Sequence, residues 1–212
     1  MVSLQRPPCA KSTCHLGQRG GWITPADCCT MHASMFRQMP DAANENDIRL
    51  AKLFPYNTSV AIYQCPAAGT QLPSMLVGNP ALKGKGLVRN YSMSGRIGAT
   101  AESEWILGSQ YPLFQKMHDI RRPDPSLAIV FVDESIQSVD DGFFATQLST
   151  VWMNSPTMRH SRGGVFSFAD GHAERWRWQA WAVEQDWWAP TVSGTVDTTS
   201  DLRRVQDAIA ER

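Results

Sequence analysis

Three residues near the C-terminal end of the sequence have side chains suited to acid–base or metal chemistry: His160, Asp170 and His172. Imidazole and carboxylate groups are common general bases and common metal ligands. A strand rises about 3.3 Å per residue, so the segment Gly164 to Ala169 alone would separate its ends by roughly 17 Å. His160 would have to fold back through Gly163 to reach Asp170. We therefore expect no catalytic centre from these three residues.

The same segment predicts a β-hairpin. Val165–Ala169 is rich in strand formers, and Asp170-Gly171 supplies the two positive-φ positions of a tight type I′ turn. A two-residue loop of this kind pairs Ala169 with His172. That register places Val165, Ser167, Glu174 and Trp176 on one face of the hairpin, and Phe166, Phe168, Ala173 and Arg175 on the other. Arg175 is then expected over a neighbouring phenylalanine as a cation–π pair.

Residues 1–46 form an irregular N-terminal segment with neither helical nor strand periodicity. One interpretation is that this segment is disordered or that its start is mis-assigned. The other is a zinc knuckle, because thiolate and imidazole ligands in close pairs suit a tetrahedral site. Its ligands would be Cys9, Cys14, Cys28 and His32.

The remaining patterns predict an α+β fold of short elements. Leu127–Val132 is apolar on both faces and should be the central strand. Leu202, Val205 and Ile209 form the apolar stripe of a final helix capped by Ser200. The other expectations are a helix over Ile48–Phe54 stopped by Pro55, strands over Val60–Cys65 and Leu87–Met93, a loop over Thr70–Gly86, a short helix over Tyr111–Ile120, and a polar linker over Thr191–Ser200.

Composition narrows the classes of function. The 20 basic and 20 acidic residues give a formal net charge of zero, which argues against a nucleic-acid partner. No nucleophile elbow, phosphate-binding glycine loop or His-Glu-x-x-His helix is present, so no enzyme is predicted. Three tryptophans, Trp181, Trp187 and Trp188, are candidates for a sugar-binding or protein-binding surface. Their burial against the hairpin is the alternative.

Several short segments occur in the order typical of a known family. They are Leu53-Phe-Pro-Tyr56, Cys65-Pro66, Arg89 to Gly95 with its Tyr-Ser-Met-Ser, Arg122 to Glu134, the nine-residue spacing from His160 to Asp170-Gly171, and Asp201 to Gln206. Together they resemble the bacterial prepilin-like proteins that are related to the pseudopilins of type II secretion. The resemblance covers roughly residues 47 to 212. It departs from the family at Ala67-Ala68, where the family usually has an aspartate.

The resemblance implies a pilin-like antiparallel sheet with short helices and a C-terminal hairpin in a globular domain over residues 47–190, followed by a linker and short helix over 191–212. It implies a non-catalytic structural subunit of a type II secretion or type IV pilus-like assembly in the cell envelope, with other pseudopilin or secretion-system subunits as partners. The family's N-terminal spine helix is absent, since no run of about 20 apolar residues occurs. Membrane association is expected only if that helix is restored. A soluble carbohydrate- or protein-binding module of the envelope is the alternative, and a metal-dependent hydrolase is the least favoured.

The resemblance also assigns candidate site residues. His160, Asp170 and Gly171 form the family motif, and family order places His160 near Asp133 or Glu134 at the end of the central strand. Because pseudopilins in the wider group hold calcium in a C-terminal loop, Asp133, Glu134, Asp140 and Asp141 are candidate calcium ligands. A solvated turn over Ser138–Gly142 is the alternative, and no other cofactor is expected.

Overall fold

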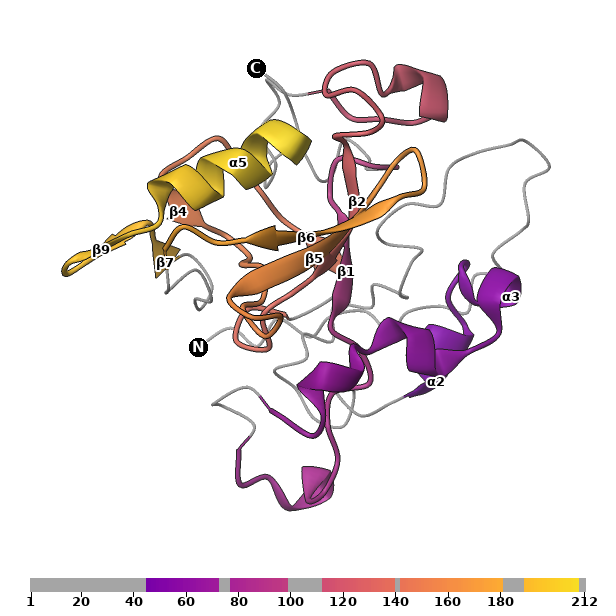
Figure 1. Ribbon diagram of the computed structural model, residues 1–212. Coiled ribbons are helices and arrows are strands. Elements are labelled where there is room, and N and C mark those ends of the chain that lie inside the picture. The colour runs from indigo at the N-terminus through magenta and orange to yellow at the C-terminus, as the bar shows by residue number, and fades with distance from the viewer. Residues whose placement is uncertain (1–44, 73–76, 99–111, 140–141, 181–188, 210–212) are drawn as a thin grey trace, which may run out of the picture.

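The computed structural model describes residues 45–72, 77–98, 112–139, 142–180 and 189–209. A five-stranded sheet organises them, with the strand order β3-β1-β2-β5-β6 (Figure 1). All neighbouring strands are antiparallel except β1 and β3, which are parallel. A mostly antiparallel sheet with a few short helices agrees with the predicted α+β class at this coarse level. The strands are β1 (Tyr91–Ser94), β2 (Ile129–Asp133), β3 (Phe143–Phe144), β5 (Gly163–Phe168) and β6 (Ala173–Arg177).

The prediction of a central strand is confirmed. β2 lies in the middle of the sheet, between β1 and β5. Ile129 and Val132 are almost completely buried. A strand covered on both faces needs apolar side chains in both directions, which is why this segment lacks polar alternation.

One face of the sheet is covered by the C-terminal helix α5 (Thr199–Ile209) (Figure 1). Leu202, Val205 and Ile209 are buried in a core that includes Val132 and Phe166 of the sheet. The predicted apolar stripe is therefore confirmed, although the helix begins one residue before Ser200. Trp152, Phe144, Trp176 and Trp178 complete much of the same core.

The hairpin is present, but its predicted register is wrong by one residue. Phe168 N–H donates to the carbonyl of His172, and Gly171 N–H donates to the carbonyl of Phe168. The loop therefore has three residues, Ala169 to Gly171, and only Gly171 has a positive φ, +95°. This geometry is a type I turn followed by a left-handed glycine, not a type I′ turn.

The changed register moves Trp176 to the face of the two phenylalanines. Its ring centroid lies 4.6 Å from that of Phe166 and 5.8 Å from that of Phe168. Arg175 lies on the opposite face, where its Nη1 donates to the carbonyl of His160, so the predicted cation–π pair is wrong. The guanidinium of Arg204 on α5 occupies that role instead, 3.9 Å from the Trp176 ring centroid.

Short helical segments precede the sheet. They are α2 (Glu45–Arg49), α3 (Phe54–Asn57) and 3-10 helices at Val60–Tyr63, Pro66–Ala68 and Pro80–Leu82. The predicted helix over Ile48–Phe54 is wrong in extent, because Pro55 sits in the first turn of α3, where its missing N–H costs nothing. The predicted strand over Val60–Cys65 is a 3-10 helix that buries Tyr63. Tertiary contacts outweigh the strand propensity of such a short segment.

The remaining differences concern short elements. β1 begins at Tyr91, four residues later than the predicted strand, and the described part of Tyr111–Ile120 holds only a 3-10 turn at Met117–Asp119. The predicted linker contains a small hairpin of β8 (Val192–Ser193) and β9 (Val196–Asp197). β4 (Val151–Trp152) pairs with β7 (Ala189–Pro190). Within the described ranges, no helix is both long and apolar enough to cross a membrane.

Candidate functional site

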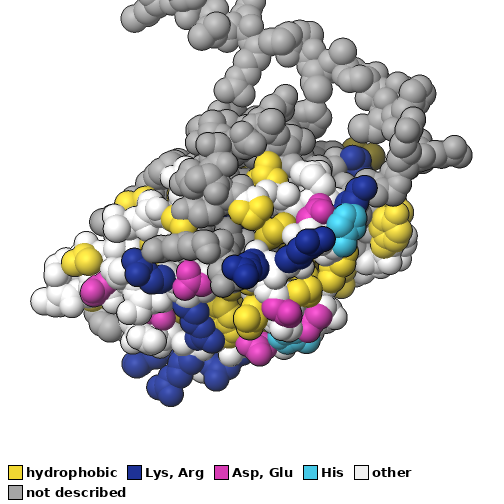
Figure 2. Space-filling model, turned by 90° about the horizontal axis from the view of Figure 1, so that it is seen from above, with side chains coloured by type: hydrophobic (Ala, Val, Ile, Leu, Met, Phe, Trp, Pro, Cys, Tyr) yellow, Lys and Arg dark blue, Asp and Glu magenta, His cyan; other side chains and the backbone are white. Residues whose placement is uncertain are grey.

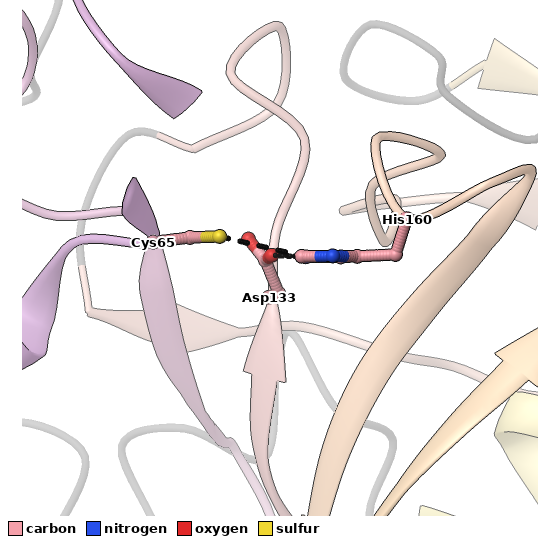
Figure 3. Close-up of side chains that lie close together, drawn as sticks. All are labelled: Cys65, Asp133 and His160. Atoms are coloured by element: carbon pink, nitrogen blue, oxygen red, sulfur yellow. Dashed lines mark hydrogen bonds and ion pairs between the residues drawn. The ribbon is translucent and has the colours of Figure 1, made fainter. Parts of the chain in front are cut away.

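Cys65, Asp133 and His160 meet at one end of the central strand (Figure 3). Asp133 is the last residue of β2, Cys65 precedes the 3-10 helix at Pro66–Ala68, and His160 lies in the turn that leads into β5. His160 Nε2 lies 2.7 Å from Asp133 Oδ2 and 3.5 Å from Cys65 Sγ. The expectation that His160 is hydrogen-bonded near Asp133 is confirmed. No role for Cys65 was expected beyond its place in the family segment.

The carboxylate of Asp133 is completely buried and is held by several groups. Arg159 forms an ion pair with its Oδ1. Asn90 Nδ2 donates to the same oxygen over 3.2 Å. A buried carboxylate is tolerated only when it is paired and hydrogen-bonded, and these contacts supply both conditions.

Asn90 connects the segment of Cys65 to the end of the central strand. Its Oδ1 accepts a hydrogen bond of 2.7 Å from the backbone N–H of Cys65. Its own backbone N–H donates to the carbonyl of Tyr63, and its carbonyl accepts from Glu134 N–H. Asn90 is buried, and its hydrogen bonds therefore fix Cys65 relative to Asp133.

Tyr91 lies beside the same cluster and is partly buried. Burial raises the pKa of its phenol well above the ordinary value, and the adjacent Asp133 and Cys65 raise this pKa further. An alkaline shift means that the phenol keeps its proton at neutral pH. Tyr91 is therefore a neutral neighbour of the Cys65 thiol.

Glu134, the residue after β2, is also completely buried but has different partners. Its carboxylate accepts hydrogen bonds from Ser92 Oγ, from Ser138 Oγ over 2.9 Å and from Asn154 Nδ2 over 2.7 Å. Successive side chains of an extended segment point in opposite directions, so Asp133 and Glu134 do not offer their carboxylates to one ion. Asp140 and Asp141, the other two candidate calcium ligands, lie outside the described residues.

Asp170, Gly171 and His172 form a separate group in the hairpin turn, at the far end of β5 from His160. His172 Nδ1 lies 2.5 Å from Asp170 Oδ1, and the His172 ring stacks on Phe168 with a centroid separation of 4.4 Å. The hydrogen bond from the His172 side chain, followed by that from its backbone N–H, holds the pKa of Asp170 below its ordinary value. The expectation that Asp170-Gly171 serves the turn agrees with this geometry.

A shallow pocket of about 350 Å³ lies on the sheet face opposite to α5. Phe131 and Ser167 of the sheet line it, together with two exposed apolar side chains, Tyr56 (82% exposed) and Ile62 (55%). Tyr91 lines the pocket and also contacts Cys65, so the pocket adjoins the Cys65–Asp133–His160 cluster. The other lining residues are Leu53, Asn57 and Tyr63.

The cluster lacks the geometry of a nucleophilic triad, because His160 uses a single ring nitrogen, Nε2, for both of its contacts. In a nucleophilic triad, one imidazole nitrogen takes the proton of the nucleophile and the other is held by the acid. Here His160 Nε2 contacts both Cys65 Sγ and Asp133 Oδ2. This arrangement does not relay a proton through the ring.

The comparisons with known proteins found no matching family model, no matching curated protein and no matching solved structure. On the face of the molecule in Figure 2, basic side chains are interspersed with acidic and hydrophobic ones. The absence of a nucleic-acid partner stays a prediction.

Sequence reasoning missed Cys65, Asn90, Tyr91 and Arg159 as members of one site. A signal for them was available, because Cys65, Asn90 and Tyr91 lie within the short segments singled out in the sequence and Arg159 directly precedes His160. Two other predicted sites fall outside the described residues. They are the tryptophan surface of Trp181, Trp187 and Trp188, and the zinc knuckle of Cys9, Cys14, Cys28 and His32.

Proposed function

We propose that this chain is a prepilin-like, non-catalytic structural subunit of a type II secretion or type IV pilus-like assembly of the cell envelope, with the described residues as its globular head. The observation that carries the proposal is the meeting of four family-like segments at one point. Cys65, Asn90, Asp133 and His160 come from four separate segments and are joined by hydrogen bonds.

The contacts within the cluster join distant parts of the sequence. Cys65 and His160 are 95 residues apart in the sequence and in side-chain contact. Asn90 and Asp133 are 43 residues apart and hydrogen-bonded. The four segments therefore share one packing environment, to which the proposal assigns a structural purpose.

The burial of the cluster supports a structural rather than a catalytic purpose. Cys65 is 3% exposed and Asp133 is completely buried, while both oxygens of Asp133 are already engaged. Buried and mutually satisfied polar groups favour one particular packing of the chain. In a subunit that must keep its shape within an assembly, such a cluster holds the pre-sheet segments against the end of β2.

An assembly subunit also needs a surface for its neighbours. Tyr56 and Ile62 are exposed beside the shallow pocket. We call these two residues the Tyr56 patch. Clustered exposed apolar residues are typical of protein interfaces. The occupant that fits the proposal is another prepilin-like subunit.

The test is site-specific photocrosslinking in the native host. A photoreactive phenylalanine analogue replaces Tyr56, and mass spectrometry identifies the crosslinked chain. The control places the same analogue at Arg203, an exposed residue of α5 on the opposite face of the sheet. We expect the Tyr56 position to crosslink to prepilin-like or secretion-system subunits, and the Arg203 position to give at least tenfold less of that product.

Other outcomes contradict the proposal. Equal crosslinking from both positions means that the Tyr56 patch is not the contact. Crosslinks only to proteins unrelated to prepilins or secretion systems mean that the assembly is wrong. If no subunit is captured while polysaccharide quenches the tryptophan fluorescence of the purified chain, the soluble binding module replaces the structural subunit.

A further inference from the structure

The Cys65–Asp133–His160 cluster brings three different kinds of metal-ligating atom to one place. Thiol sulfur, imidazole nitrogen and carboxylate oxygen all lie within 4.8 Å of one another. Each comes from a different part of the chain, and the three side chains point toward a common centre in Figure 3. In a chain of hydrogen bonds, the middle group uses two separate atoms. Here one atom, His160 Nε2, lies close to both Cys65 Sγ and Asp133 Oδ2.

The separation of the sulfur and the nitrogen suits a small tetrahedral ion. Bond lengths of about 2.3 Å for Zn–S and about 2.0–2.1 Å for Zn–N predict a ligand separation of roughly 3.5 Å between sulfur and nitrogen. The distance between Cys65 Sγ and His160 Nε2 is 3.5 Å. The same tetrahedral geometry predicts roughly 3.3 Å between nitrogen and oxygen. His160 Nε2 and Asp133 Oδ2 are 2.7 Å apart and would have to separate by about 0.6 Å on binding.

The surrounding groups hold the three ligands in place. Arg159 and Asn90 engage Oδ1 of Asp133, while Oδ2 is the oxygen that faces the ring of His160. The carboxylate can thus bridge the guanidinium and an ion through separate oxygens. The backbone carbonyl of His160 accepts from Arg175, and the backbone N–H of Cys65 donates to Asn90. Outer contacts of this kind orient metal ligands in proteins.

We infer that Cys65, Asp133 and His160 form a binding site for a divalent transition metal ion of the zinc type. A thiolate together with an imidazole selects zinc over calcium or magnesium, which prefer oxygen ligands. His160 is 23% exposed, so water can take the fourth position from its solvent side. As the ion binds, the thiol proton of Cys65 is released to solvent, the proton shared by His160 Nε2 and Asp133 Oδ2 moves to Nδ1 or to solvent, and no electron is transferred. The ion crosslinks three segments of the fold, and the inference does not depend on the assembly role proposed above.

The test titrates Co²⁺ into the full-length chain after chelator treatment. Cys9, Cys14, Cys28 and Cys29 are replaced by serine in this background, so that Cys65 is the one remaining thiol. We expect one equivalent of Co²⁺ to produce a thiolate-to-cobalt charge-transfer band and the visible bands of tetrahedral cobalt. Zn²⁺ should displace the cobalt and should raise the melting temperature, and chelator should reverse that rise.

Matched variants locate the site. Cys65→Ser should abolish the charge-transfer band, and His160→Gln should weaken Co²⁺ binding at least tenfold. His172→Gln is the control, because His172 is also hydrogen-bonded to an aspartate but has no thiol beside it among the described residues. The absence of the band in the parent chain overturns the inference whatever the variants do. So does a band that persists in Cys65→Ser, or an equal loss in His160→Gln and His172→Gln.

The metal test and the crosslinking test fail independently. Loss of the cobalt band with crosslinking at Tyr56 retained would remove the metal site and leave the assembly role. A cobalt band without crosslinking to subunits would retain the metal site and remove the assembly role.

Discussion

The pair of Asp170 and His172 shows how one exposed residue can set the protonation of another. The carboxylate of Asp170 accepts hydrogen bonds from the side chain and the backbone N–H of His172. Hydrogen bonds to the charged form favour it, which explains why the pKa of Asp170 is lowered. Asp170 is exposed and His172 is partly exposed, so solvent weakens their interaction, which serves mainly to order the turn.

Replacing His172 should therefore raise the pKa of Asp170. His172→Phe keeps a ring that can stack on Phe168 but removes the imidazole donor. The folded-state pKa of Asp170 lies below its unfolded value, so its contribution to stability is present above the unfolded pKa and is lost as the pH falls through the folded pKa. Carboxyl-detected NMR titration should show a higher Asp170 midpoint in His172→Phe than in the parent. Identical midpoints would mean that the side-chain hydrogen bond is not the cause.

At the scale of the element, the hairpin depends on the backbone conformation of Gly171. Its φ is +95°, and a Cβ at this position would meet nothing within 4 Å. The obstacle to substitution is thus the strained conformation and not a steric clash. Gly163 is the opposite case, because a Cβ there would lie 2.4 Å from the carbonyl oxygen of Trp176.

We expect Gly171→Ala to lower the free energy of unfolding by about 1–2 kcal/mol, because alanine tolerates a positive φ poorly. Gly171→Asn should cost less, since asparagine adopts left-handed conformations more readily. Urea denaturation measures both variants. If alanine and asparagine were equally tolerated at no cost, the three-residue loop with a left-handed glycine would be the wrong description of this turn.

The sequence predicted that this hairpin exists but not the length of its loop. Asp-Gly correctly indicated a hairpin between Val165 and Arg177, but two-residue and three-residue loops can use the same dipeptide. Changing from one loop length to the other shifts the pairing by one residue. Each side chain of the returning strand then lies on the opposite face of the hairpin. Packing decided it, because the observed register lets Phe166, Phe168 and Trp176 share the core under α5.

For the whole molecule, the sheet is covered unequally on its two faces. α5 seals one face with Leu202, Val205 and Ile209. The other face holds the shallow pocket and the exposed Tyr56 patch. The opposite face also carries a smaller buried cluster around Met93, Ile97 and Phe114, and only its part at the pocket is available for contacts.

Removing one core side chain of α5 should test this division. Leu202→Ala should lower the free energy of unfolding by about 2–5 kcal/mol, because it removes buried apolar surface and leaves a cavity. Arg203→Ala, one residue away on the exposed side, should change it by no more than about 0.5 kcal/mol. Both are measured by urea denaturation of the full chain. Equal effects would mean that α5 does not dock through its apolar stripe.

The sequence by itself determined the elements whose information is local. The unbroken apolar run ending at Val132 predicts a central strand, and the spacing of Leu202, Val205 and Ile209 predicts the final helix, because each pattern repeats within a few turns or pleats. Only the tertiary structure decided the hairpin register and the meeting of Cys65, Asn90, Asp133 and His160. Those contacts join residues far apart in the chain, and their energies depend on burial and pairing that no short segment carries alone.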